Sequence, residues 1–124
     1  MAANQTAIRI LIVEDEYLVA LYLEDLLTEM GHRVLYSASR INEALHLART
    51  SEIDFAVLDV NLAGTQSFPI ADVLRARGIP FVFATGYGTD GLIDGYRHET
   101  ALRKPYEAAK LAEAIARAVP SITL

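Results

Sequence analysis

The stretch Phe55-Ala56-Val57-Leu58-Asp59 decides how the rest of the chain is interpreted. Four apolar residues in succession are typical of a β-strand that is buried on both faces, as in a parallel sheet covered by helices. The first apolar run, residues 8–13, is broken only by Arg9 and ends in a similar way, at Glu14-Asp15-Glu16. A carboxylate at the end of a buried strand is costly unless a partner stabilises it, so Asp59 is the first candidate functional residue.

Two more apolar runs end in polar groups. Residues 81–84 lead into Thr85, and the short run Ala101-Leu102 leads through Arg103 to Lys104. If the strands are parallel, their carboxyl ends lie along one edge of the sheet, which is where open α/β sheets bind ligands. Two acids, a hydroxyl and an ammonium group at one edge suit a phosphoryl group together with a hard metal ion.

Segments with helical periodicity alternate with these apolar runs. Ser67 is expected to cap the third helix, with Pro69 in its first turn and Gly78 at its end. The alternation predicts an α/β fold, with a doubly wound parallel sheet of five strands and helices on both faces. We expect strands at residues 8–13, 33–37, 55–58, 81–84 and 101–103, and helices at residues 17–30, 41–49, 67–78 and 107–119.

The composition limits the classes of function. The chain of 124 residues is 52% hydrophobic, which is enough for one domain with a single core. It has no cysteine, which excludes disulfides, thiol catalysis and zinc–thiolate sites. A net charge of −5 without a basic stripe argues against nucleic acid or an anionic membrane as the main partner. Residues 1–7 lack the features of a signal peptide, so a cytoplasmic location is expected.

The polar strand ends occur in a familiar order: Glu14-Asp15 after the first strand, Asp59 after the third, Thr85 after the fourth and Lys104-Pro105 after the fifth. This pattern resembles the receiver domains of bacterial two-component response regulators. The resemblance extends over residues 8–119, between tails at residues 1–7 and 120–124, with no output domain. It implies the flavodoxin-like strand order 2-1-3-4-5.

The resemblance also assigns a role to each residue that would meet a phosphoryl group. Asp59 would be the nucleophile that takes the group from a phosphohistidine of a sensor histidine kinase. Lys104 would contact one phosphoryl oxygen as a point charge, and Thr85 would donate its hydroxyl to another. The family usually has a cis Lys-Pro bond at Lys104-Pro105. Such a module would catalyse only its own phosphorylation and dephosphorylation, and is not an enzyme in the ordinary sense.

A magnesium site follows from the same resemblance. Glu14, Asp15 and Asp59 would supply carboxylate oxygens, and Asn61 would supply its backbone carbonyl. Mg²⁺ prefers an octahedral shell of oxygen ligands, and waters would complete it. The metal is needed because a dianionic phosphoryl group must approach a cluster of carboxylates.

A narrower resemblance concerns the stretch Phe83-Ala84-Thr85-Gly86-Tyr87. It looks like the signature of a receiver subfamily named for its Phe-Ala-Thr-Gly sequence, whose members often pair with kinases of the HWE class. Most receivers carry Tyr or Phe three residues before the lysine, but this chain has Ala101. We therefore expect residues 86–99, which contain four glycines, to be mobile and to report phosphorylation instead. A weakened helix there also predicts a monomer.

Several alternatives compete with the phosphoacceptor hypothesis. Alone, Asp59 is compatible with an Asx-turn and Thr85 with an ordinary turn, but their convergence with Lys104 is not explained in that way. The stretch Gly86 to Gly91 matches the dinucleotide pattern GxGxxG, but no convincing helix follows it. A flavodoxin-like redox protein, a pseudo-receiver that binds partners without phosphorylation, and a phosphate sink are the other possibilities.

Overall fold

The computed structural model describes residues 7–62, 64–85 and 101–119. Up to residue 85 the longer strands alternate with helices, as the apolar periodicity predicted, and two additional short strands lie at residues 61–66. The bounds of the elements are β1 Arg9–Val13, α1 Tyr17–Glu29, β2 Arg33–Ala38, α2 Ile41–Thr50, β3 Phe55–Asp59, β4 Asn61–Leu62, β5 Thr65–Gln66, α3 Phe68–Ala76, β6 Phe81–Thr85, β7 Ala101–Arg103 and α4 Ala108–Ala118.

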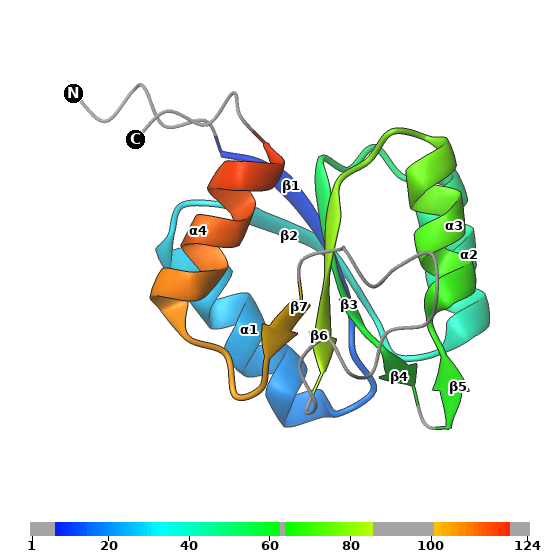
Figure 1. The fold of residues 1–124 in the computed structure, drawn as a ribbon, viewed down its shortest axis with the longest axis horizontal. Helices are drawn as coiled ribbons and strands as arrows, with labels where there is room; N and C mark the ends of the chain where they lie inside the picture. The colour runs from blue at the N-terminus through cyan, green and yellow to red at the C-terminus, as the bar shows by residue number, and fades with distance from the viewer. Residues whose placement is uncertain (1–6, 63, 86–100, 120–124) are drawn as a thin grey trace.

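Five of these strands form one parallel sheet in the order β2-β1-β3-β6-β7. Because β6 and β7 are its fourth and fifth strands along the chain, this is the predicted order 2-1-3-4-5. Helices α1 and α4 cover one face, and α2 and α3 cover the other (Figure 1). The predicted doubly wound fold is therefore confirmed. No helix among the described residues is long and apolar enough to cross a membrane.

The core lies on both faces of β3, whose five residues are all buried. Ala56 and Leu58 face a cluster on the α2 and α3 side, and Phe55 and Val57 face a cluster on the α1 and α4 side. Burial of apolar surface contributes about 25 cal/mol per Å², so this central strand is one of the best-anchored segments of the chain. Asp59 is consequently held at the end of a rigid element.

Strands β2, β3 and β6 each extend one residue further than the sequence indicated. Asp59 and Thr85 are the last residues of β3 and β6, and do not merely follow them. The ladder continues because Asp59 pairs with Ala84, and the N–H of Val60 donates to the carbonyl of Ala84 at 3.0 Å. Both polar side chains are thus positioned by sheet hydrogen bonds and not by a turn.

A small antiparallel hairpin, β4 paired with β5, follows β3 and was not predicted. Two-residue strands are too short to give an alternating pattern in the sequence. The described part of the connection is held by Asn61, whose Oδ1 accepts a hydrogen bond from the N–H of Gly64 at 3.0 Å. Gly64 has a φ of 90°, which glycine adopts without strain. The hairpin is anchored by Leu62, which is buried.

The prediction that the Ser67 side chain caps α3 is wrong. Ser67 occupies the N-cap position, but its hydroxyl makes no capping hydrogen bond. An N-cap residue normally has extended backbone angles, whereas Ser67 has a ψ of 6°. Its N–H is committed to the carbonyl of Val60 at 2.9 Å, which ties the helix to the end of β3. Pro69 does lie in the first turn, as expected.

Candidate functional site

The four predicted polar groups lie at the carboxyl ends of neighbouring strands. Glu14 follows β1, Asp59 ends β3, Thr85 ends β6 and Lys104 follows β7. Strands β1 and β3 are adjacent, and β2 lies on the far side of β1, so the strand order reverses here. Open α/β sheets bind their ligands at such a switch point. The sheet topology therefore places the candidate site where a ligand is expected.

Three carboxylates form an acidic cluster at this edge. Glu14, Asp15 and Asp59 each offer one oxygen, and the three oxygens lie within 4.8 Å of one another. Glu14 and Asp59 are buried, and Asp15 is half-buried. An all-oxygen donor set suits Mg²⁺ or Ca²⁺ and not a soft transition metal. The three carboxylates thus fit Mg²⁺, the ion that the resemblance to receiver domains implies.

Lys104 neutralises part of this acidic cluster. Its Nζ lies 2.8 Å from Oε1 of Glu14 and 3.0 Å from Oδ2 of Asp59. The backbone N–H of Lys104 donates to the carbonyl of Thr85 at 3.1 Å, which fixes the start of the loop. The Lys104-Pro105 peptide bond is cis, as the resemblance implied. The cation and the nucleophile candidate are therefore in direct contact.

Backbone N–H groups hold the carboxylates in place. The N–H of Asn61 donates to Oδ1 of Asp59 at 3.3 Å, and the N–H of Glu16 donates to Oε2 of Glu14 at 3.1 Å. Thr85 is buried at the end of the strand next to Asp59. The structure thus brings Glu14, Asp15, Asp59 and Lys104 together. Thr85 lies at the end of β6, the strand that pairs with β3. A metal-binding role for the Asn61 carbonyl stays a prediction.

The charges in the cluster are strongly coupled. Burial, followed by a hydrogen bond shared with the Glu14 carboxyl, raises the pKa of Asp59 from 3.8 to about 7, although the hydrogen bond from Lys104 opposes the shift. For Lys104, burial disfavours the ammonium form, but hydrogen bonds to Glu14 and Asp59 outweigh burial and raise its pKa. Near neutral pH the Asp59 carboxyl of the metal-free cluster is therefore partly protonated, and a divalent cation would displace that proton.

This coupling predicts a pH dependence of stability. The folded-state pKa of Asp59 lies above its unfolded value, so its stabilising contribution is full below about pH 4 and is lost as the pH rises through about 7. An asparagine at this position does not titrate. We therefore expect the melting temperature of Asp59→Asn, relative to the metal-free wild type, to increase between about pH 5 and about pH 8.

Thermal melts in chelator at several pH values measure this difference directly. Asp54→Asn provides a contrast, because Arg9 hydrogen-bonds the Asp54 carboxylate and lowers its pKa. Its stabilising contribution should be present above about pH 4 and lost on acidification. A difference between wild type and Asp59→Asn that stays constant from about pH 5 to about pH 8 would refute the raised pKa.

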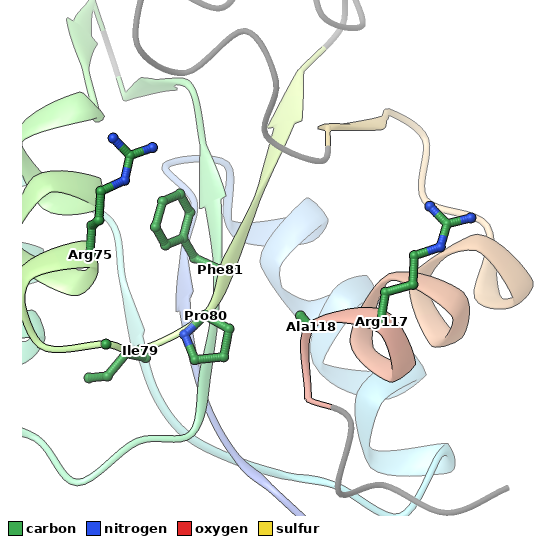
Figure 2. A pocket seen from close by; sticks show the side chains of 7 residues that line it. Arg75, Ile79, Pro80, Phe81, Arg117 and Ala118 are labelled. Carbon is green, nitrogen blue, oxygen red and sulfur yellow. The ribbon is translucent and has the colours of Figure 1, made fainter.

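Two cavities near the strand ends differ in chemistry. One of about 320 Å³ lies between α1 and the end of β2, and Glu14 and Asp15 form part of its wall with Tyr17, Leu21 and Ser37. It gives solvent access to the acidic cluster. A second, of about 430 Å³, lies at the opposite edge of the sheet, where Arg75, Phe81 and Arg117 line it (Figure 2). No carboxylate lines that opening, so it is not the candidate site.

The sequence analysis missed Tyr106, which the fold places beside this site. Tyr106 directly follows Lys104-Pro105 and is buried. The negative charges of Glu14 and Asp59 act on its hydroxyl. The signal available in the sequence was an aromatic residue next to the predicted phosphate-binding lysine, which by itself is equally typical of a core residue.

Comparison with known proteins agrees with this geometry. The family model of the response regulator receiver domain matches residues 10–116. The chain belongs to this family. Receiver domains are signalling modules of two-component systems, so the flavodoxin-like redox alternative has no support. The GxGxxG stretch and the predicted switch segment, residues 86–99, lie outside the described residues.

Individual relatives are response regulators. The phyllosphere-induced regulator PhyR of Methylorubrum extorquens is 34% identical over 122 residues, which are 94% of this chain and 45% of PhyR. The crystal structure of the response regulator PhyR from Brucella abortus has a TM-score of 0.81 at 29% identity, and the match covers 94% of this chain and 49% of PhyR. The chain spans about half the length of the curated relatives it matches.

A third relative is similar to this chain over nearly its whole length. The solution structure of the BeF3-activated conformation of SdrG from Pseudomonas melonis Fr1 has a TM-score of 0.75 at 41% identity. The match covers 87% of this chain and 92% of SdrG. A solved receiver of similar length thus has the same fold in an activated conformation.

Proposed function

We propose that this chain is a phosphoacceptor that takes a phosphoryl group from a sensor histidine kinase onto Asp59, in a Mg²⁺-dependent reaction. One observation carries the proposal. Lys104 Nζ contacts Asp59 at 3.0 Å, and Asp59 lies in a carboxylate cluster with Glu14 and Asp15. A nucleophilic carboxylate, a cation-binding cluster and a nearby positive side chain are what phosphoryl transfer requires.

The donors of the metal site would be Glu14, Asp15, Asp59 and the backbone carbonyl of Asn61. When bound, Mg²⁺ neutralises the charge between the phosphoryl group and these carboxylates. Asp15 is the half-buried member and adjoins the cavity beside α1. We expect the affinity for Mg²⁺ to be modest, because water supplies much of the shell.

The chain's own residues would carry the transfer. An oxygen of Asp59 attacks the phosphorus atom, an O–P bond forms, and the P–N bond to the kinase histidine breaks. The Lys104 ammonium moves from its carboxylate partners to a phosphoryl oxygen, and Thr85 donates its hydroxyl to another. Water on the same site would later hydrolyse the acyl phosphate, so the module would also catalyse its own dephosphorylation.

Incubation with a small phosphodonor and Mg²⁺, followed by phosphate-affinity electrophoresis, tests the proposal. We expect a labelled species that appears with Mg²⁺ and is absent in chelator. Asp15→Asn should raise the Mg²⁺ concentration needed, because it removes one anionic donor. Glu29→Gln, an exposed neutralisation at the end of α1, is the matched control. Absence of labelling in the wild type would favour the pseudo-receiver alternative.

We propose that the partner kinase docks on α1. Tyr17, Leu18, Leu21 and Tyr22 lie at helical spacing and are exposed, with 73% and 76% exposure for the first two. Large exposed side chains of this type on a polar surface mark protein interaction sites. The start of α1 is also next to the acidic cluster, so a protein bound here would bring a phosphohistidine close to Asp59. We also propose a cytoplasmic location for the complex, because a histidine kinase needs ATP as its phosphoryl donor.

The narrower assignments rest on sequence resemblance. We propose membership of the Phe-Ala-Thr-Gly subfamily, a partner kinase of the HWE class, a receiver domain at residues 8–119, and a monomer. Ala101 pairs with Phe83 and packs against the α2 and α3 cluster, so β7 offers no aromatic switch at that position. The protein could signal by contact with a downstream protein, pass the phosphoryl group on, or act as a phosphate sink. The fate of the phosphoryl group distinguishes these three roles.

A further inference from the structure

Tyr106 occupies an unusual position for a core residue. Its side chain is 4% exposed and belongs to the apolar cluster between the sheet and helices α1 and α4. Its backbone is tied to α1, because the hydroxyl of Tyr22 donates to the Tyr106 carbonyl at 3.4 Å. Only Pro105 separates it from Lys104, so the lysine loop and the buried ring are held together.

The hydroxyl of Tyr106 has no hydrogen-bond partner within the described residues, although it is fully buried. A buried hydroxyl without a partner costs free energy that a phenylalanine in the same place would avoid. Burial raises the pKa of the Tyr106 phenol, and the negative charges of Glu14 and Asp59 raise it further. Tyr106 therefore stays protonated, and its hydroxyl is a buried donor that feels the charge of two carboxylates.

Glu14 is the acceptor whose partners change during the proposed reaction. Its side chain is fully buried, with Oε2 accepting from the Glu16 N–H and Oε1 paired with Lys104 at 2.8 Å. Oε1 accepts no well-aligned hydrogen bond in the described chain, so when the Lys104 ammonium moves to a phosphoryl oxygen, Oε1 also loses its ion-pair partner. A buried carboxylate oxygen without a donor is unfavourable, so a replacement is needed.

We propose that Tyr106 is a positioning residue of the phosphorylation site, whose hydroxyl donates to the Glu14 carboxylate, directly or through one water, once Lys104 has turned to the phosphoryl group. This inference rests on the proposed function for its timing. It adds Tyr106 as a residue that holds the proposed metal-binding carboxylate of Glu14 in place from the apolar core. Hydrogen-bond partners of metal-binding carboxylates commonly affect metal affinity by about 10–100-fold.

The first test compares Tyr106→Phe with the wild type in binding Mg²⁺ together with BeF3, a phosphoryl mimic, by NMR titration. We expect about tenfold weaker binding of the mimic, with an unchanged or higher melting temperature, since only an unpartnered hydroxyl is removed. Tyr36→Phe, which removes an exposed phenol on β2, should bind within about twofold of the wild type. Wild-type affinity in Tyr106→Phe would overturn the proposal.

The second test needs neither metal nor phosphate, and so separates this inference from the proposed function. In metal-free Lys104→Met the Glu14 carboxylate has lost its cation, and we expect the Cζ resonance of Tyr106 to shift as its hydroxyl becomes a donor. Tyr36, exposed on β2, is the internal reference. Lys104→Gln repeats the measurement if the methionine variant does not fold. An unshifted Tyr106 resonance in the folded variant would refute the proposal, even if the wild type accepts no phosphoryl group.

Discussion

Replacing Asp59 with alanine is expected to abolish phosphorylation, reducing labelling by a small phosphodonor to the level seen without protein. Asp59 is the buried carboxylate in contact with both Glu14 and Lys104, and it ends the central strand of the sheet. No other carboxylate in the described chain combines these contacts. Because the nucleophile forms the bond to phosphorus, its loss cannot be offset by better positioning of the remaining groups. Phosphate-affinity electrophoresis with and without Mg²⁺ measures the effect.

Two further variants make this prediction specific. Asp59→Asn keeps the shape and most packing of the side chain, and should be equally inactive while melting at a higher temperature than the metal-free wild type near pH 8. Asp25→Ala, an exposed change on α1, should be labelled at the wild-type rate. Full labelling of Asp59→Ala would mean that another residue accepts the phosphoryl group, and the assignment of Asp59 would be wrong.

The fold was predictable because its strands are unusually apolar. Residues of β3 and β6 form nearly continuous hydrophobic runs, which indicate strands buried on both faces. The β4–β5 hairpin could not be predicted, since pairs of two residues leave no periodic signal. Serine is a common N-cap residue, so the sequence predicted a cap at Ser67. The hydrogen bond from the Ser67 N–H to the Val60 carbonyl holds its backbone in a geometry that does not suit capping.

The residues of the site were predictable from the sequence, but their individual contacts were not. Strand order alone brings Glu14, Asp59 and Lys104 to one edge, so their proximity follows from topology. The pairing of Lys104 with Glu14 was not expected, because the amino-acid sequence does not show which of several nearby carboxylates a long lysine side chain will contact. Tyr106 was missed for a related reason. Burial next to charge depends on how α1 and α4 pack over the sheet, and local sequence does not show this.

The second large effect concerns Lys104. Lys104→Met should destabilise the metal-free protein by about 3 kcal/mol, because it leaves the buried Glu14 carboxylate without its cation. It should also slow phosphoryl transfer by about 10²–10³-fold, the usual cost of losing one group that stabilises charge in the transition state. Urea denaturation gives the first quantity, and the rate of labelling at saturating Mg²⁺ gives the second.

The double variant Glu14→Gln with Lys104→Met separates the two roles of the lysine. Removing the carboxylate together with its cation eliminates the uncompensated charge, so most of the stability should return. The rate of phosphoryl transfer should not return, because no ammonium is left to meet the phosphoryl group. Recovery of both quantities would show that Lys104 acts only by balancing Glu14. Recovery of neither would mean that Glu14 is not the group that makes the loss of Lys104 costly.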